Sequence, residues 1–252
     1  GQLAPLGRCG RSPSTPRAPR ARSHTHFCRA ILQCFGVRVG PGTGRCTIVY
    51  FGEGAASEGD FHGALNFAAT LSCPVIFFCR NNGYAISTGT EEQYRGDGIA
   101  SRAIGYGMHT IRVDGNDILA VHEATAAARA VAITNNCPVL VEAMSYRVGH
   151  HSTSDDSTAY RSVEEIDAWR HGRNPVTRFR SYLEAKGLWD DELEMEQRKS
   201  EKKGVLAALP AAERREKPPI ETLFTDVYKE MPLHLKEQEQ ELLEHLKKYP
   251  EP

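Results

Sequence analysis

The chain lacks the features that would place it in a membrane or in an oxidising compartment. No apolar run approaches the roughly 18 residues that a membrane-spanning helix needs, so we expect no membrane partner. The seven cysteines form no CxxC pair and no metal-ligand spacing. We therefore expect a reducing compartment without a disulfide framework. No internal repeat is visible.

Acidic residues are absent from the first 46 positions, which carry eight arginines. This segment is also rich in proline, serine and glycine, a composition that cannot form a core, and we expect residues 1–45 to be disordered. The composition is typical of a mitochondrial transit peptide. An alternative exon or a misassembled start of the chain is the competing interpretation.

The charge of the remaining chain is acidic, although the net charge of all 252 residues is only -1. Without the eight N-terminal arginines, 23 basic residues stand against 32 acidic ones. This balance makes nucleic acid an improbable partner for the folded part. The length is sufficient for one globular domain with a core of its own.

The stretch from Cys46 to Thr88 predicts a strand, a glycine turn, a helix, a second strand and a polar turn. The apolar runs Thr47–Phe51 and Pro74–Cys79 have the length and the β-branched or aromatic content of buried parallel strands. A helix is expected from about Gly59 to Thr70. Because the carboxyl ends of parallel strands meet at one edge of a sheet, the two turns are expected to form a ligand site there.

Further alternation of strands and helices continues to about residue 162. Two more strands are predicted at 110–113 and 138–143, and Asp117 is the expected N-cap of a helix from Ile118 to about Thr134. Residues 83–107 are predicted to be mostly loop, with a helical turn at 99–103. Strand-helix-strand repetition predicts an α/β fold with a doubly wound parallel sheet.

The last third of the chain has a different character. The polar stretch 146–162 has no periodicity, and a loop of that length in a compact domain is usually functional. Beyond it, charged amphipathic segments predict helices. We therefore expect a core over 46–162 and a C-terminal helical region over 163–252. The helices are predicted at 163–169, 175–186, 190–209 and 235–248.

The two polar turns carry residues that suit a metal ion and a diphosphate. Glu53 offers a carboxylate, and the side chain of Asn82 and the backbone carbonyl of Tyr84 offer further oxygen ligands of the kind that Mg²⁺ takes. Arg80 adds a fork of donors for phosphate oxygens. The alternative is a dinucleotide site, but the glycines fall as GxGxxxxG and no acid follows the second strand.

These motifs resemble the thiamine-diphosphate and Mg²⁺ signature of thiamine-dependent enzymes, which is usually GDG followed by NN. The stretches RNNGYAIST, EQYRGDGIA, RVDGND and YRVGHHSTSDDSTAYRS are similar to those of α subunits of branched-chain 2-oxoacid dehydrogenases. Glu53 replaces the commoner aspartate, as it does in that subfamily. The resemblance runs from about Thr47 to the C-terminal helices, and it implies a thiamine-diphosphate-binding fold that is incomplete on its N-terminal side.

The resemblance also implies roles for individual residues. Glu53, Asn82 and Tyr84 would ligate Mg²⁺. Cofactor contacts would come from Gly54, Ala55, Arg80 and His151, and His151 would also be catalytic, near the reactive end of the cofactor. As plain sequence, the alternative is that His150 and His151 are two solvated loop histidines, and the loop context favours a functional role. Facing a 2-oxo acid, a histidine is suited to acid-base work or charge stabilisation.

Ser152 and Ser162 match the regulatory phosphorylation positions of this family, which implies a kinase and a phosphatase as partners. A phosphate at Ser152 would add nearly two negative charges beside Asp155 and Asp156. We expect the resulting repulsion to disorder the loop.

The implied reaction is oxidative decarboxylation of branched-chain 2-oxo acids, with transfer of the acyl group to a lipoyl carrier, as in a 3-methyl-2-oxobutanoate dehydrogenase. The implied partners are a β subunit in an α₂β₂ assembly and a lipoyl-bearing acyltransferase core in the mitochondrial matrix. The K⁺ site of the family has no counterpart in residues 1–45. Two alternatives stay open: a catalytically silent form that binds the β subunit, and a pyruvate or acetoin-type homologue.

Overall fold

The computed structural model describes residues 44–225 and 228–249. The prediction for residues 1–45 therefore lies, apart from its last two positions, outside the described residues. Two compact units divide the chain, one ending at Leu188 and the other beginning at Trp189. Each unit is described by itself below.

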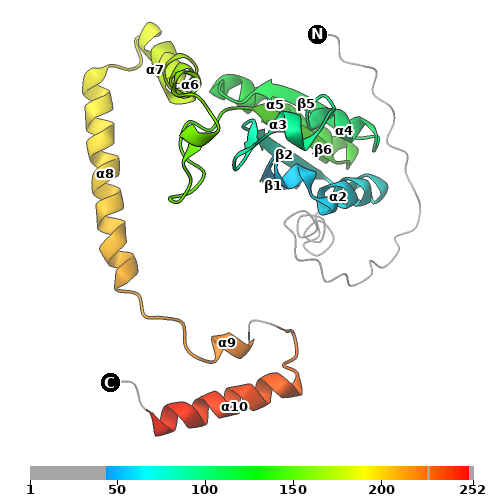
Figure 1. Cartoon of the computed structure of the whole chain (residues 1–252), viewed down its shortest axis with the longest axis vertical. Coiled ribbons are helices and arrows are strands. Elements are labelled where there is room, and N and C mark those ends of the chain that lie inside the picture. Colours follow the sequence, from blue (N-terminus) through cyan, green and yellow to red (C-terminus); the bar gives the residue numbers. More distant parts are fainter. Residues whose placement is uncertain (1–43, 226–227, 250–252) are drawn as a thin grey trace. The chain divides into compact units, whose positions relative to one another are not determined.

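The first unit is built on a sheet of four parallel strands (Figure 1). Its spatial order is β1 (Thr47–Gly52), β2 (Val75–Asn81), β6 (Val139–Met144) and β5 (His109–Asp114). β2 and β6 lie in the centre, and every residue of β6 from 139 to 143 is buried. The predicted strands are all present, and their parallel pairing confirms the α/β prediction.

Helices cover both faces of this sheet, which confirms the doubly wound arrangement (Figure 1). On one face, α2 (Gly59–Thr70) and α4 (Ala100–Ile104) bury Phe61 and other apolar side chains against Phe77. On the other face, α5 (Ile118–Asn135) packs alanines against the strands. The alternation of side chains along β2 supplies both cores, because successive residues of a strand point to opposite faces.

Local signals in the sequence fix the ends of α5. The Asp117 carboxylate accepts hydrogen bonds from the backbone N–H groups of Leu119 and Ala120, at 3.0 and 3.1 Å. This confirms the predicted N-cap. At the other end Asn136 has a φ of +48°, the left-handed conformation that commonly terminates helices.

The stretch 83–107 is more ordered than predicted. It contains a short antiparallel hairpin of β3 (Tyr84–Ala85) and β4 (Thr88–Gly89), followed by α3 (Thr90–Gln93) and α4. These elements are too short to produce a hydrophobic period, which is why sequence periodicity predicted mostly loop. The hairpin places Tyr84 directly after the polar turn of β2.

Two helices close the first unit, α6 (Val163–Gly172) and α7 (Pro175–Ala185). Asn174 caps α7, and Pro175 occupies its first turn, where a missing N–H costs nothing. Arg178 ties α7 to the end of β5 through the Asp114 carboxylate, 2.9 Å away.

The second unit is helical, with α8 (Asp191–Glu213), α9 (Thr222–Thr225) and α10 (Leu233–Lys248). The prediction ended the first of these helices at Leu209, before Pro210, but α8 continues through the proline to Glu213. Pro210 removes only one backbone N–H bond near the end of the helix, and its own carbonyl still accepts from the N–H of Arg214 at 3.2 Å. Within the described ranges, no helix is long and apolar enough to cross a membrane.

Candidate active site

The two predicted polar turns lie side by side at the carboxyl edge of the sheet. β1 and β2 are neighbouring parallel strands that end together, with Gly52 in register with Arg80. Directly beyond them, the backbone N–H of Asn82 donates to Oε2 of Glu53 at 3.1 Å. The structure thus brings together the acid of the first turn and the paired asparagines of the second.

Glu53 is a buried carboxylate, 1% exposed, at the end of β1. Burial raises its pKa, an effect that backbone hydrogen bonds such as that from Asn82 only partly offset. Within the part of the chain that the structure describes, no cationic side chain forms an ion pair with it. A buried carboxylate without a paired cation is costly, and a bound metal ion would remove that cost.

Two side-chain turns shape the loop after β2. Oδ1 of Asn81 accepts from the N–H of Gly83, and Oδ1 of Asn82 accepts from the N–H of Tyr84, both at 3.1 Å. Gly83 has a φ of +87°, which favours glycine at this position. The paired asparagines therefore fold the chain so that the backbone of Asn82 and of Tyr84 lies beside Glu53.

The donor set of these turns fits a hard cation. It offers carboxylate, amide and backbone oxygen atoms, which are the ligands that Mg²⁺ takes in proteins. Among the described residues, no group of three or more His, Cys, Asp and Glu could hold a metal. A metal at Glu53 would therefore share its remaining positions with water or with ligand phosphate, as Mg²⁺ commonly does.

The residues predicted to contact a diphosphate surround the same turn. Gly54 is in close contact with β3, because a Cβ at this position would lie 2.7 Å from Cβ of Ala85. Ala55 is exposed at the start of a 3₁₀ turn, η1 (Ala55–Ser57). Arg80 is exposed at the end of β2 and forms no ion pair among the described residues. Its guanidinium is thus available to an anion.

The polar loop 146–162 is held by its own acidic residues. Oδ2 of Asp155 accepts from the backbone N–H of His151 and from the hydroxyl of Tyr160, both at 2.8 Å. Oδ1 of Asp156 accepts from the backbone and hydroxyl of Thr158. These hydrogen bonds lower the pKa of both carboxyls, so both are charged at neutral pH.

The two adjacent histidines of this loop have different environments. Nδ1 of His150 accepts from the backbone N–H of Ser157 at 3.1 Å and lies 3.0 Å from the Ser157 hydroxyl. An accepting Nδ1 assigns the ring proton of neutral His150 to Nε2. His151 is exposed, and its backbone makes the bond to Asp155. Its imidazole is therefore free to meet a ligand.

Both predicted phosphorylation serines are exposed to solvent. The hydroxyl of Ser152 lies 3.1 Å from that of Ser154. Ser162 is the N-cap of α6, and its Oγ accepts from the N–H of Glu165 at 3.1 Å. Between them, η2 (Ser157–Ala159) forms a 3₁₀ turn.

An arginine and three tyrosines join this loop to the turn after β2. The guanidinium of Arg161, a residue 4% exposed, lies over the rings of Tyr84, Tyr146 and Tyr160, with distances to the ring centres of 5.3, 5.1 and 5.5 Å. Cation–π contacts of this kind are stronger when buried. Hydroxyls of Tyr84 and Tyr146 converge on Oε1 of Glu165. The loop is thereby anchored beside Tyr84.

A cavity of about 750 Å³ opens beside these elements. Asn82 and Tyr84 line it on the side of the β2 turn, and Tyr146, Glu165 and Trp169 line it on the side of the loop and α6. Burial and the bond to Glu165 raise the pKa of Tyr146 to about 12, so its hydroxyl remains protonated. Of the predicted site residues, Asn82 and Tyr84 line this cavity, whereas Glu53, Arg80 and His151 do not.

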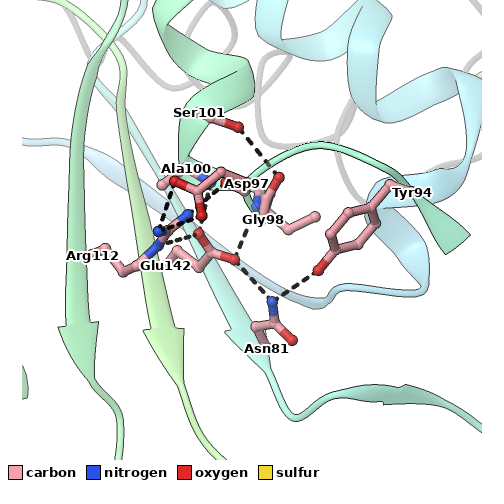
Figure 2. A network of polar contacts seen from close by, with 9 residues as sticks. Asn81, Tyr94, Asp97, Gly98, Ala100, Ser101, Arg112 and Glu142 are labelled. Atoms are coloured by element: carbon pink, nitrogen blue, oxygen red, sulfur yellow. Dashed lines mark hydrogen bonds and ion pairs between the residues drawn. The ribbon is translucent and has the colours of Figure 1, made fainter. Parts of the chain in front are cut away.

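Sequence reasoning missed a buried network behind the turn, centred on Glu142 in β6 (Figure 2). Glu142 is fully buried, and its carboxylate accepts from the side chains of Asn81 and Arg112 at 2.9 and 3.0 Å. The one available signal was an acid inside an otherwise apolar strand, since buried charges occur only when they are paired. Arg161 and Glu165 gave no comparable signal.

Comparisons with known proteins show what the chain as a whole is similar to. Residues 38–221 match the family model described as dehydrogenase E1 component. The chain is similar to proteins named 2-oxoisovalerate dehydrogenase subunit alpha, mitochondrial. Identity is 56% to that of Caenorhabditis elegans, 60% to that of Dictyostelium discoideum and 58% to the human protein, over 90%, 83% and 82% of this chain. The matches cover 52%, 48% and 46% of those relatives, so the chain spans about half their length.

Proposed function

The chain belongs to the dehydrogenase E1 component family, and on that premise we propose that it is the α-type subunit of an enzyme that oxidatively decarboxylates branched-chain 2-oxo acids. The names of its relatives support this substrate class, because 2-oxoisovalerate is a branched-chain 2-oxo acid. They favour it over the pyruvate and acetoin-type alternative.

The observation that carries the proposal is the buried Glu53 carboxylate beside the N–H of Asn82. In the proposed site, Glu53, the side-chain oxygen of Asn82 and the backbone carbonyl of Tyr84 hold Mg²⁺. A bound Mg²⁺ would offset the cost of burying an unpaired carboxylate, and it would supply positive charge for the phosphates of thiamine diphosphate.

Other residues of the turn are proposed to bind the diphosphate, and two of them are small enough to leave room for it. Gly54 allows the chain to approach β3, and Ala55 adds only a methyl group at the surface. Arg80 supplies a positive fork for phosphate oxygens. Thiamine diphosphate, when bound, supplies the carbanion chemistry that decarboxylates a 2-oxo acid, so these residues need only bind and orient it.

His151 is the proposed catalytic residue of this chain. The bond from its backbone N–H to Asp155 fixes the main chain and leaves the imidazole exposed. An imidazole can hold a proton near neutral pH, so it can stabilise the negative charge of a bound 2-oxo acid or move a proton.

The proposed partners follow from the family. A β subunit would complete an α₂β₂ assembly, and a lipoyl-bearing acyltransferase core would accept the acyl group. The relatives are named mitochondrial, which supports the matrix as the location. A kinase and a phosphatase would act on Ser152 and Ser162, both of which are exposed. We do not propose a K⁺ site among the described residues.

The test is to co-produce the chain with a β-type subunit and titrate Mg²⁺ in the presence of thiamine diphosphate. Decarboxylation of 4-methyl-2-oxopentanoate is then measured. We expect saturable binding and turnover, and loss of both in Glu53→Gln, because an amide cannot replace a charged ligand. Glu58→Gln is the matched control, since Glu58 is a nearby but exposed carboxylate.

The outcomes separate the remaining alternatives. Assembly with the β subunit without cofactor binding would overturn the enzymatic proposal and support a catalytically silent binding form. Equal binding by the wild type and Glu53→Gln would refute the assigned metal site. Turnover of pyruvate in preference to 4-methyl-2-oxopentanoate would refute the substrate class.

A further inference from the structure

Glu142 is a charged residue in the interior of the sheet. Its side chain is 0% exposed in the middle strand β6. Oε1 accepts from Nδ2 of Asn81 and the backbone N–H of Ile99, each at 2.9 Å. Oε2 accepts from the backbone N–H of Ala100 at 2.8 Å and from Nε of Arg112 at 3.0 Å. Four donors thus converge on one carboxylate (Figure 2).

The carboxylate dictates which way the Asn81 amide faces. A charged carboxylate only accepts hydrogen bonds, so Asn81 must present its NH₂ group to Glu142. Burial raises the pKa of Glu142, but the four hydrogen bonds outweigh burial and bring the pKa below its ordinary value. The carboxyl group is therefore charged, and both of its oxygens accept. The hydroxyl of Tyr94 also accepts from Nδ2 of Asn81, at 3.2 Å. The opposite end of the Asn81 amide is therefore an acceptor.

That acceptor holds the turn. Oδ1 of Asn81 accepts from the N–H of Gly83 at 3.1 Å, and the residue between them, Asn82, donates its own N–H to Glu53. Reversal of the Asn81 amide would place NH₂ against the N–H of Gly83, two donors in conflict. Glu142 thus fixes the backbone at Asn82 through one intermediate side chain, although it does not line the cavity.

We propose that Glu142 is a positioning residue that sets the conformation of the Asn81–Tyr84 turn through the side chain of Asn81. The inference rests on the proposed function for its consequence, which is a correctly oriented Mg²⁺ ligand at Asn82. Residues that orient metal ligands in this way typically change metal affinity by about 10–100-fold when they are replaced.

Glu142 also anchors the segment before α4, and a purely structural role must be separated from positioning. Arg112 joins that segment to Glu142, since its Nη1 binds both oxygens of Asp97 at 2.9 and 3.1 Å. Asp97→Asn weakens this outer contact and leaves the bond between Asn81 and Glu142 in place. It is therefore the matched control.

The first measurement needs no cofactor. Backbone hydrogen exchange is followed in the full chain for the peptide that contains residues 81–85, in the wild type, Glu142→Gln, Asn81→Ala and Asp97→Asn. In Glu142→Gln the charged Arg112 should take the one amide oxygen and leave the NH₂ group facing Asn81, which would reverse the Asn81 amide. Asn81→Ala removes the acceptor of the Gly83 N–H directly. We therefore expect exchange at least about 10-fold faster in both variants and little change in Asp97→Asn. In the Asn81→Ala background, Glu142→Gln should raise the exchange rate of this peptide by less than about twofold.

The second measurement is Mg²⁺ affinity at a fixed concentration of thiamine diphosphate, in the chain co-produced with a β-type subunit. Glu142→Gln and Asn81→Ala should weaken it by about 10–100-fold, again without additivity, and Asp97→Asn should not. Independent effects that multiply in the double variant would overturn the inference, because they would show that Glu142 does not act through Asn81.

Failure of the inference and failure of the proposed function give different results. If the wild type binds no Mg²⁺ and thiamine diphosphate, the proposed function fails, and the exchange data still decide whether Glu142 holds the turn. Unchanged exchange in Glu142→Gln overturns the inference alone. If Glu142→Gln does not fold, Asn81→Ala decides, since unchanged exchange there would equally refute positioning through Asn81.

Discussion

Replacement of Gly54 by alanine tests whether the close approach of the first polar turn to β3 builds the site. Gly54 has helical dihedral angles, φ −60° and ψ −44°, so an alanine there meets no backbone strain. Its added methyl carbon, however, would lie 2.7 Å from Cβ and 3.4 Å from Cα of Ala85. Neither neighbour is the end of a flexible side chain, so one backbone segment must move.

The size of the effect follows from that overlap. Overpacking of this kind costs about 1–3 kcal/mol of unfolding free energy. For a chain of this length, each kcal/mol lowers Tm by roughly 2–4 °C. Because Ala85 follows Tyr84, movement of β3 also displaces the proposed Mg²⁺ ligand at Tyr84. We expect a lower Tm together with weaker binding of Mg²⁺ and thiamine diphosphate.

The assay is thermal unfolding with and without cofactor, on Gly54→Ala and two companions. Gly63→Ala places a methyl group in open space inside α2, so it should stabilise the chain by about 0.5–1 kcal/mol. Ala85→Gly removes the methyl group that the new side chain meets, and in the Gly54→Ala background it should restore part of the lost Tm. A Gly54→Ala protein with wild-type Tm and wild-type cofactor affinity would refute the steric reasoning.

Three further predictions concern the polar loop 146–162 and the contact between α7 and β5. Ser162→Ala should lower the unfolding free energy by about 1 kcal/mol in a urea titration, because the cap on the N–H of Glu165 is lost, and Ser162→Asp should retain most of it. Burial raises the pKa of Asp114, but hydrogen bonds, chiefly from Arg178, bring it below its ordinary value of 3.8. The charged Asp114 therefore stabilises the folded chain above that pH, and this stabilisation is lost as the pH falls through the lower pKa of the folded state. Arg178→Gln should therefore flatten the acid limb of a plot of urea midpoint against pH, and an unchanged limb would contradict the assignment. Ser152→Glu should abolish decarboxylation in the assembled enzyme, whereas retained activity would show that charge at this position does not control the loop.

Much of the site was predictable because it depends on strand ends that are close in sequence. β1 and β2 are consecutive strands, and consecutive strands are usually neighbours in a parallel sheet, so Glu53 and Asn82 were expected to meet at one edge, and they do. Asp117 was recognisable as an N-cap because capping is a local interaction between a side chain and the next turn of backbone. Positions set by neighbours along the chain are readable from the sequence.

The tertiary structure alone decided the contacts that hold those turns in place. Asn81 and Glu142 are 61 positions apart, and they meet only because β6 lies between β2 and β5. Arg161 reaches Tyr84 only because the polar loop packs against the segment after β2. Apolar periodicity specifies which residues form strands, but every order of buried parallel strands satisfies it. The sequence by itself therefore predicted the ligands of the proposed site, and the packing of distant segments determined which contacts hold those residues in place.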